Sequence, residues 1–247
     1  MIKRLIKAYL AKRGYEIRRA KPKVPHLRQA NHFTMQAALG RSRKRGVEVA
    51  TVIDVGASDG RWSRDCLKFF PDANYLLVEA QRGHRDGLEI FKQDVPKGDY
   101  VLAAAGAAAG TIFFDASDLF GGVASDTPAE QNSIEVPVIA LDEAIESKGL
   151  AGPYLLKLDT HGYELPILEG AKNLLSKASL VIIETYNFKL TSESLRYFEI
   201  CAHMESLGFS PVENVDFMLR AKDGAFWQMD SFFIPSDSQV FKSNQFK

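Results

Sequence analysis

Four ionisable side chains lie close together in the segment 157–164, which reads KLDTHGYE. They are Lys157, Asp159, His161 and Glu164. A positioned carboxylate or imidazole can take a proton from a weak nucleophile, and His has the unperturbed pKa better suited to this near neutral pH. The segment is therefore a candidate catalytic site. The structural alternative is a solvated, capped start of a helix, where the helix dipole favours Glu164.

A second candidate site is the glycine-containing turn 54–60, which reads DVGASDG. Gly56 and Gly60 allow a tight turn and a close approach of the backbone to a ligand. The spacing is GxxxG and not the GxGxxG of dinucleotide sites, and Asp54 and Asp59 would oppose a pyrophosphate. A ligand with a positive end and no phosphate, such as S-adenosylmethionine, suits this turn better. Capping of the turn by the two aspartates is the structural alternative.

Further polar residues follow other apolar runs. Glu79 is placed to accept hydrogen bonds from the hydroxyls of a ribose. Glu184 and Asn187 are candidate substrate contacts, and with Asp159 they form an alternative Mg²⁺ site, because hard oxygen ligands suit that ion. Structural polar contacts explain the same residues without a metal, so our expectation is no metal, with Mg²⁺ as the alternative.

The elements that must position these residues alternate along the chain. We expect strands at 50–55, 75–78, 100–105, 154–158 and 180–184, and helices at 27–45, 61–70, 141–148, 165–176 and 192–207. Shorter extended segments are expected at 111–114, 136–139, 209–212, 217–219 and 229–234, the last ones antiparallel. This alternation predicts an α/β fold, with a mostly parallel sheet and helices on both faces. Ligands of such sheets bind beyond the carboxyl ends of the strands.

The charge is unevenly distributed although the net charge is +0. Residues 1–46 contain fourteen Lys and Arg residues and one acidic residue, Glu16. Residues 1–10 have the pattern of a short basic amphipathic helix, and 21–25 that of a linker. We expect two parts, a basic arm at 1–25 and a domain at 26–247. Residues 1–20 would bind an anionic membrane surface or pack on the domain.

The composition excludes several classes of protein. The 247 residues are 46% hydrophobic and 25% charged, which is ordinary for a globular protein. The two cysteines, Cys66 and Cys201, form no metal or disulfide framework. No apolar run approaches the roughly 20 residues of a membrane span, and the N-terminus lacks the pattern of a signal peptide. We therefore expect a cytoplasmic protein that can be peripheral on the inner face of the membrane.

Two motifs resemble those of the FkbM-type methyltransferases, and the resemblance covers about residues 35–235. The motifs are VIDVGASDGRWS (52–63) and LLKLDTHGYELPILEGA (155–171). In the second and more specific motif, Lys157, Asp159, Gly162, Glu164 and the segment 168–171 match the family position by position. His161 stands where the family often has Glu or Gln. The resemblance implies a class I methyltransferase fold with a Rossmann-like seven-stranded sheet, S-adenosylmethionine as cofactor, and O-methylation of a sugar hydroxyl.

Roles follow from the motifs and the resemblance together. Cofactor contacts are expected from Asp54, Gly56, Ala57, Ser58, Asp59, Gly60, Glu79, Ala80, Ala104, Ala105 and Asp159. Asp159 or His161 is the candidate base, and Lys157 and Glu164 would orient the site or contact substrate. Ser125, Glu184 and Asn187 are candidate substrate contacts, and 120–122 borders the substrate or the cofactor.

The implied acceptor is a polysaccharide, a glycolipid or a related metabolite. Nucleic acid is not expected as a partner, although the basic arm keeps an RNA acceptor open. Three further functions are compatible with the sequence: a small-metabolite methyltransferase, a nucleotide-dependent oxidoreductase on a similar sheet, and a non-catalytic binding protein.

Overall fold

The computed structural model describes residues 32–125, 127–128 and 132–246. The predicted basic arm at 1–25 lies outside the described residues. So does the start of the helix expected at 27–45, up to residue 31. No helix in the described ranges is long and apolar enough to cross a membrane.

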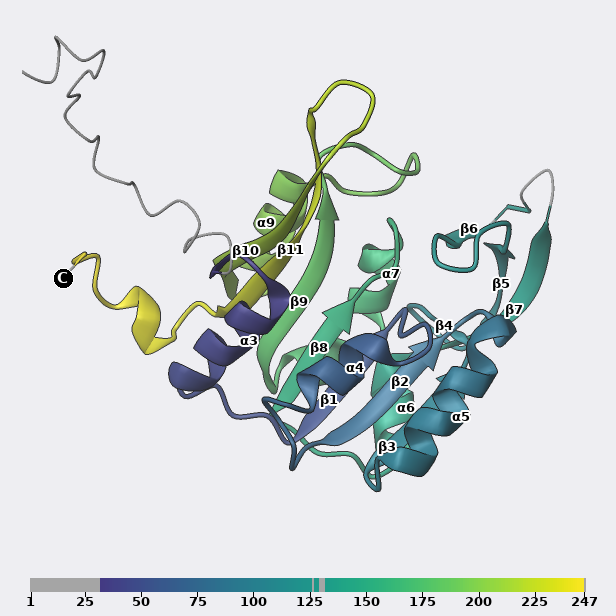
Figure 1. The fold of residues 1–247 in the computed structure, drawn as a ribbon, viewed down its shortest axis with the longest axis horizontal. Helices are drawn as coiled ribbons and strands as arrows, with labels where there is room; N and C mark the ends of the chain where they lie inside the picture. The colour runs from purple at the N-terminus through teal and green to yellow at the C-terminus, as the bar shows by residue number, and fades with distance from the viewer. Residues whose placement is uncertain (1–31, 126, 129–131, 247) are drawn as a thin grey trace, which may run out of the picture. The chain divides into compact units, whose positions relative to one another are not determined.

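A seven-stranded sheet positions the site (Figure 1), in the order β10-β11-β9-β8-β1-β2-β3. Its strands are β1 (Thr51–Val55), β2 (Asn74–Glu79), β3 (Gly98–Leu102), β8 (Tyr154–Leu158), β9 (Ala178–Tyr186), β10 (Phe209–Leu219) and β11 (Phe226–Pro235). The five strands from β3 to β9 pair in parallel, whereas β11 pairs antiparallel with both β9 and β10. The expected α/β fold, with its mostly parallel seven-stranded sheet, is confirmed.

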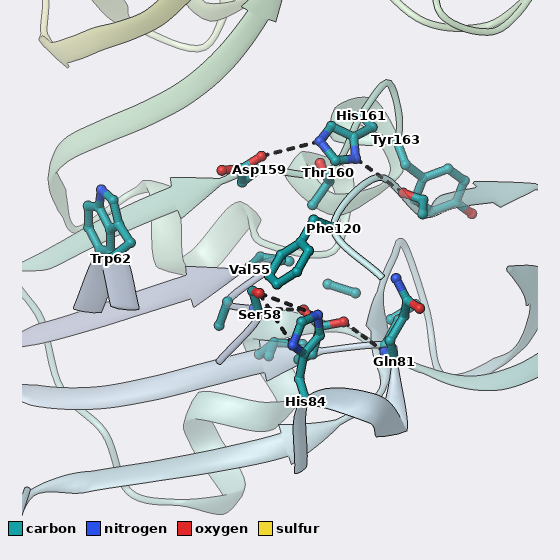
Figure 2. A pocket seen from close by; sticks show the side chains of 18 of the residues that line it. Val55, Ser58, Trp62, Gln81, His84, Phe120, Asp159, Thr160, His161 and Tyr163 are labelled. Carbon is teal, nitrogen blue, oxygen red and sulfur yellow. Dashed lines mark hydrogen bonds and ion pairs between the residues drawn. The ribbon is translucent and has the colours of Figure 1, made fainter. Parts of the chain in front are cut away.

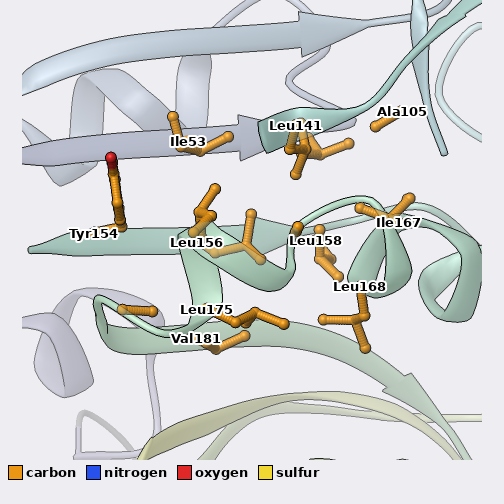
Figure 3. Packing of buried hydrophobic residues seen from close by; sticks show 14 of the residues in the cluster. Ile53, Ala105, Leu141, Tyr154, Leu156, Leu158, Ile167, Leu168, Leu175 and Val181 are labelled. Atoms are coloured by element: carbon orange, nitrogen blue, oxygen red, sulfur yellow. The ribbon is translucent and has the colours of Figure 1, made fainter. Parts of the chain in front are cut away.

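Helices cover both faces of this sheet, as two hydrophobic clusters demonstrate. The helices are α3 (Met35–Lys44), α4 (Arg61–Cys66), α5 (Arg85–Asp94), α6 (Leu141–Ser147), α7 (Glu164–Glu169), α8 (Lys172–Leu175) and α9 (Tyr197–Ser206), with 3₁₀ turns at η2 (Arg82–His84) and η3 (Gln239–Phe241). Alternate residues of β1 point to opposite faces of the sheet. Val52 packs with α3, α4 and α5 on one face. Ile53 and Val55 pack with α6 to α9 on the other. Figure 3 shows part of the second cluster, where Ile53 and Leu156 face Leu141 and Leu175.

The order of the strands reverses at β1. This strand pairs with β2 on one side and with β8 on the other, so that Val55 lies opposite both Val78 and Leu158. The segments that follow β1 and β8 therefore leave the sheet side by side, at the place where ligands of doubly wound sheets bind.

A second, four-stranded sheet was not predicted. It has the order β4-β7-β5-β6 and lies beyond the carboxyl end of β2 (Figure 1). Its strands are β4 (Ala104–Ala105), β5 (Gly110–Asp115), β6 (Val123–Ser125) and β7 (Ser133–Ile139). The strand expected at 100–105 is thus two strands in different sheets, β3 and β4. The hairpin expected at 111–114 is confirmed by the antiparallel pairing of β5 and β6.

Several helix boundaries differ from the prediction. The helix expected at 165–176 is broken into α7 and α8, because the backbone at Gly170 approaches the carbonyl oxygen of Gly106, and an added Cβ would lie 2.1 Å from that oxygen. Helix α5 was not predicted at all. Helix α9 begins at Tyr197 and not at 192. At this start the Glu199 carboxylate accepts from the backbone amide of Arg196 at 2.9 Å and from its guanidinium at 2.7 Å.

In the remaining cases a helix is shorter than predicted, or two predicted strands are one. Helix α3 begins at Met35, with the Thr34 hydroxyl accepting from the amide of Ala37, and α4 ends at Cys66. The extended segments expected at 209–212 and 217–219 are one strand, β10, whose register shifts along its length. These differences lie at element ends, where sequence patterns are least decisive.

Candidate functional site

A cavity of about 700 Å³ lies at the carboxyl ends of β1, β2 and β8. Figure 2 shows it between Ser58 and His84 on one side and Asp159 and His161 on the other. Most of the predicted cofactor residues line it: Gly56, Ala57, Ser58, Glu79, Ala80, Ala104, Ala105 and Asp159. The volume is in the range of sites that hold small molecules and cofactors.

The turn after β1 is tightly packed against the turn after β8. Gly56 has φ +74, and an added Cβ would lie 2.0 Å from the carbonyl oxygen of Asp159. The amide of Asp159 donates in return to the carbonyl of Val55 at 3.0 Å. Only glycine fits this position, because it has no Cβ and tolerates a positive φ. The two predicted motifs therefore form one structural unit.

Glu79 is held by two backbone amides. Its Oε2 accepts from the amide of Ser58 at 2.8 Å, and its Oε1 accepts from the amide of Gln81 at 2.7 Å. Each carboxylate oxygen has capacity for a further hydrogen bond. Glu79 lines the cavity and is 6% exposed, so this acceptor group is fixed in position before a ligand arrives.

Three residues predicted to contact a cofactor do not line the cavity. Asp54 is buried and its Oδ2 accepts from the hydroxyl of Ser63 at 2.7 Å; burial raises its pKa to about 6. Asp59 instead forms a bidentate pair with Arg61, at 2.8 and 2.6 Å. A Cβ at Gly60 would meet side chains of the core, which explains the glycine without a ligand. These positions shape the turn, and their direct contact with a cofactor stays a prediction.

Lys157 is a buried cation at the end of β8. Its Nζ donates to Asp159 Oδ2 at 2.9 Å and lies 3.6 Å from Asp230 Oδ1 on β11. Burial lowers the pKa of Lys157, but the charges of Asp159 and Asp230 outweigh this effect and raise it. Burial likewise raises the pKa of Asp159, and the charge of Lys157 outweighs it and holds that pKa below its usual value. Lys157 does not line the cavity. Of its two predicted roles, orienting the site or contacting substrate, its contact with Asp159 agrees with the first.

His161 lies between a carboxyl group at the end of β8 and one near the end of β9. Its Nε2 lies 3.5 Å from Asp159 Oδ1 and 3.5 Å from Glu184 Oε2. It adopts φ +50, which is uncommon for a residue other than glycine and is frequent at functional sites. Burial and then the charge of Asp159 raise the pKa of Glu184 to about 8. Asp159 and His161 face the cavity, as expected of a candidate base (Figure 2).

Glu164 has the structural role that was the alternative to catalysis. It is buried at the start of α7, and its Oε1 accepts from the amide of Gly162 at 2.8 Å and from the hydroxyl of Thr160 at 3.2 Å. Burial raises its pKa. These contacts fix the turn that carries His161, which agrees with the first of its two predicted roles, orienting the site or contacting substrate.

None of the three predicted substrate residues lines the cavity. The hydroxyl of Ser125 contacts that of Thr127 at 3.3 Å, and the backbone amide of Asn187 donates to the carbonyl of Trp227 at 2.9 Å. The third, Glu184, contacts His161 from the other side. Of the segment 120–122, Phe120 and Gly122 line the cavity, as expected of a border segment.

The sequence analysis did not predict the two residues that connect the segment 118–122 to the end of β2 and to the turn 54–60. Gln81 Nε2 donates to the carbonyls of Asp118 and Leu119, each at 3.0 Å. His84 contacts the carbonyl of Leu119 at 2.8 Å and the hydroxyl of Ser58 at 3.3 Å. The only available signal was their position shortly after the second strand, and nothing in the sequence relates them to 118–122.

Comparison with known proteins identifies the family. The family model described as "Methyltransferase FkbM domain" matches residues 54–211. The chain belongs to the FkbM methyltransferase family. The match covers both motifs and the strands from β1 to the start of β10, so the FkbM motifs are the residues that bring Gly56 and Asp159 together. The predicted family, that of the FkbM methyltransferases, is confirmed.

The likeness to a solved FkbM structure supports the fold. An FkbM methyltransferase from Methylobacillus flagellatus KT matches with a TM-score of 0.50 and 15% identity, over 74% of this chain and 43% of that chain. This chain thus spans less than half the length of that FkbM protein. The magnesium protoporphyrin IX methyltransferase ChlM from Synechocystis PCC 6803, with bound SAH, matches with a TM-score of 0.47 and 11% identity, over 95% and 100% of the two chains. No curated protein matches the sequence.

Proposed function

We propose that this FkbM-family chain is an S-adenosylmethionine-dependent O-methyltransferase that acts on a hydroxyl of a sugar in a polysaccharide, glycolipid or related metabolite. The observation that carries the proposal is the arrangement of a single cavity. One wall holds Glu79 and the glycine turn, and the opposite wall holds Asp159 and His161. A donor-binding carboxylate and a candidate base therefore face the same space.

The donor side fits S-adenosylmethionine. Glu79 offers fixed acceptors for ribose hydroxyls, and the small residues Gly56, Ala57 and Ala104 leave room at the floor of the cavity. When bound, this donor supplies a methyl group on a sulfonium sulfur. Besides Asp159, the carboxylates of Asp65, Glu79 and Asp216 line the cavity, and the one lysine or arginine among its described lining residues, Arg61, pairs with Asp59. This excess of acidic groups is suited to a cationic ligand, because opposite charges attract over short distances.

The acceptor side fits a hydroxyl. A sugar hydroxyl is a poor nucleophile near pH 7, so a base that takes its proton accelerates transfer by roughly 10²–10⁴-fold. Asp159 keeps a low pKa through Lys157, so it stays an anion that accepts a hydrogen bond from the hydroxyl. His161 Nε2, which lies 3.5 Å from Asp159 Oδ1, is the neighbouring acceptor for the proton, because imidazole is the side chain that most often acts as a general base.

A row of aromatic rings next to this cluster favours a sugar as acceptor. His161 and Tyr186 have ring centroids 6.3 Å apart, Tyr186 and Trp227 5.9 Å, and Trp227 and Phe188 5.5 Å. Trp227 and Phe188 are half-buried, so ring surface stays accessible. Aromatic rings beside a few fixed polar groups form sites for ligands that have both apolar and polar faces, as sugars do.

The test is methyl transfer from labelled S-adenosylmethionine to a panel of glycans, glycolipids, RNA and small hydroxylated metabolites. We expect labelled product with a sugar acceptor. Asp159→Asn should lower turnover by roughly 10²–10⁴-fold while binding of the donor, measured by calorimetry, changes little. Glu79→Gln should instead weaken donor binding. Asp237→Asn, an exposed aspartate outside the site, is the matched control.

Two outcomes would overturn the proposal. One is the absence of donor binding by the wild-type protein. The other is transfer only to RNA or to an acceptor without a sugar, which would keep the methyltransferase family and replace the acceptor.

A further inference from the structure

Three side-chain atoms with lone pairs converge at the ends of β8 and β9. They are Asp159 Oδ1, His161 Nε2 and Glu184 Oε2, and the ligand atoms of these residues all lie within 4.8 Å of one another. The imidazole nitrogen is 3.5 Å from each carboxylate oxygen. An ion bound at about 2.0–2.2 Å from each atom would have ligands roughly this far apart.

The remaining polar atoms of the three residues are engaged elsewhere. Asp159 Oδ2 accepts from Lys157 at 2.9 Å, and Glu184 Oε1 accepts from Gln228. His161 Nδ1 lies 3.2 Å from the carbonyl oxygen of Gly122. Because a carbonyl only accepts, Nδ1 carries the proton of a neutral ring, and Nε2 then presents a lone pair to the two carboxylates.

This pattern of outer contacts is typical of a metal site. A histidine ligand usually donates its second ring N–H to a carbonyl or carboxylate, and carboxylate ligands are oriented by further hydrogen bonds. Without a cation, three atoms with lone pairs meet in a partly buried place, and one of them, Glu184 Oε2, also accepts from the hydroxyl of Tyr186. A metal ion would relieve the repulsion between these lone pairs, and so would an additional proton on His161 or Glu184.

We propose that Asp159, His161 and Glu184 bind one divalent first-row transition-metal ion, for which Mn²⁺ is the probe. One imidazole with two carboxylates suits Mn²⁺ or Zn²⁺ better than Mg²⁺, which prefers oxygen ligands and retained water. The set differs from the Asp159, Glu184 and Asn187 set considered from the sequence. His161 takes the third position because the turn after β8 directs it toward Glu184.

The charges around the site are consistent with a bound cation. Asp159, Glu184 and Asp230 surround the single buried ammonium group of Lys157 among the described residues. Buried charges are costly unless they are paired. A divalent ion between Asp159 and Glu184 would pair with both carboxyl groups in their ionised form.

The ion would also act on the acceptor. Asp159 and His161 line the cavity, so an ion held by them would polarise an acceptor hydroxyl and lower its pKa. With the ion bound, His161 Nε2 is a ligand and not the proton acceptor, and the hydroxyl proton passes to water. This role rests on the proposed function, whereas binding of the ion does not.

The test is titration of Mn²⁺ into chelator-treated, full-length protein by calorimetry. We expect one saturable ion per chain, with affinity at least about tenfold lower in His161→Gln and in Glu184→Gln. His203→Gln and Glu205→Gln on α9 change the same residue types away from the site and should leave the affinity unchanged. A second measurement needs no variant: bound Mn²⁺ should broaden the NMR signals of the His161 ring and not those of His203.

The outcomes separate the ion from the enzyme. No saturable binding, or no selective broadening at His161, would overturn the ion site and favour a protonated His161 or Glu184. Methyl transfer by a protein that binds no ion would overturn the site and leave the proposed function intact. Ion binding at His161 in a protein that transfers no methyl group would support the site and count against the proposed function.

Discussion

The backbone of Gly56 lies against the carbonyl of Asp159, so closely that an added Cβ would lie 2.0 Å from that oxygen. Gly56 follows β1 and Asp159 follows β8, and the two strands are neighbours in parallel register. The donor-binding turn and the candidate base are thus positioned by the same contact. A larger side chain at residue 56 should therefore displace residues on both walls of the cavity.

Gly56→Ala should lower stability and donor affinity together. The positive φ alone costs an alanine roughly 1–2 kcal/mol, and the overlap with the Asp159 carbonyl requires the two turns to separate. Gly224→Ala is the matched control, because Gly224 has φ +73 and nothing lies within 4 Å of its added Cβ. Thermal unfolding and donor calorimetry of both variants measure the difference. Equal losses would show that the close approach to Asp159 carries no cost of its own.

Lys157→Met should be much more destabilising than a similar change at the surface. Lys157 is 2% exposed at its side chain and faces Asp159 and Asp230, so its removal leaves two carboxylates without their cation. We expect a loss of about 3 kcal/mol in the free energy of unfolding; this is the low end for a broken buried pair, because Asp159 is 37% exposed.

The matched control for Lys157 is Lys148→Met. Lys148 pairs with Asp99 at the surface, and such pairs contribute about 0–1 kcal/mol. Urea unfolding of both variants at pH 7 measures the contrast. Similar losses in the two variants would contradict the assignment of Lys157 as the cation that neutralises the site.

Asp54 should make stability depend on pH. Burial raises its pKa from 3.8 to about 6 in the folded protein, so the folded state holds a proton more tightly than the unfolded state. Its contribution is therefore most favourable below about pH 4 and is lost as pH rises through about 6, by roughly 3 kcal/mol.

Asp54→Asn removes this dependence and keeps an oxygen that can accept from Ser63. Relative to the wild type, the variant should gain stability between pH 4 and pH 6 and level off above. Denaturant unfolding across this range measures the gain, and Asp72→Asn at an exposed position should produce none. A gain that is independent of pH would contradict the raised pKa of Asp54.

Deletion of residues 1–20 should reduce binding to anionic membranes. Residues 1–20 contain part of the excess of Lys and Arg over acidic residues in 1–46. Each Lys or Arg near an anionic surface contributes about 1 kcal/mol to membrane binding. Sedimentation with vesicles that contain phosphatidylserine measures the loss, and vesicles of neutral lipid alone are the control. Equal sedimentation of both proteins would favour an arm that does not bind membranes.

The sequence alone predicted the strands that matter and the residues after them. The turn 54–60 and the segment 157–164 are local patterns, in which a buried apolar run ends in glycines and charges. Because parallel strands end at one edge of the sheet, Glu79 and Asp159 could be expected at the same crevice before any coordinates were known. Both line the cavity, and the family expected from these motifs is the one that the comparison identifies.

The tertiary structure decided which of the charged residues face that crevice. In the sequence, Asp54 and Glu164 are as plausible as Asp159 as catalytic or binding residues. In the structure, the carboxylate of Asp54 accepts from the hydroxyl of Ser63, and that of Glu164 accepts from the amide of Gly162 in the turn before it. The side-chain direction depends on packing and on backbone angles that no local pattern specifies.

The contact between His161 and Glu184 also required the fold. The two residues are separated by α7, α8 and most of β9, and they meet only because β8 and β9 are neighbours and His161 adopts a positive φ. Residue types and spacing thus determine which strand ends carry chemistry. The pairing order of the strands and the packing of their turns determine which of those groups touch, since these depend on contacts between residues far apart in the chain.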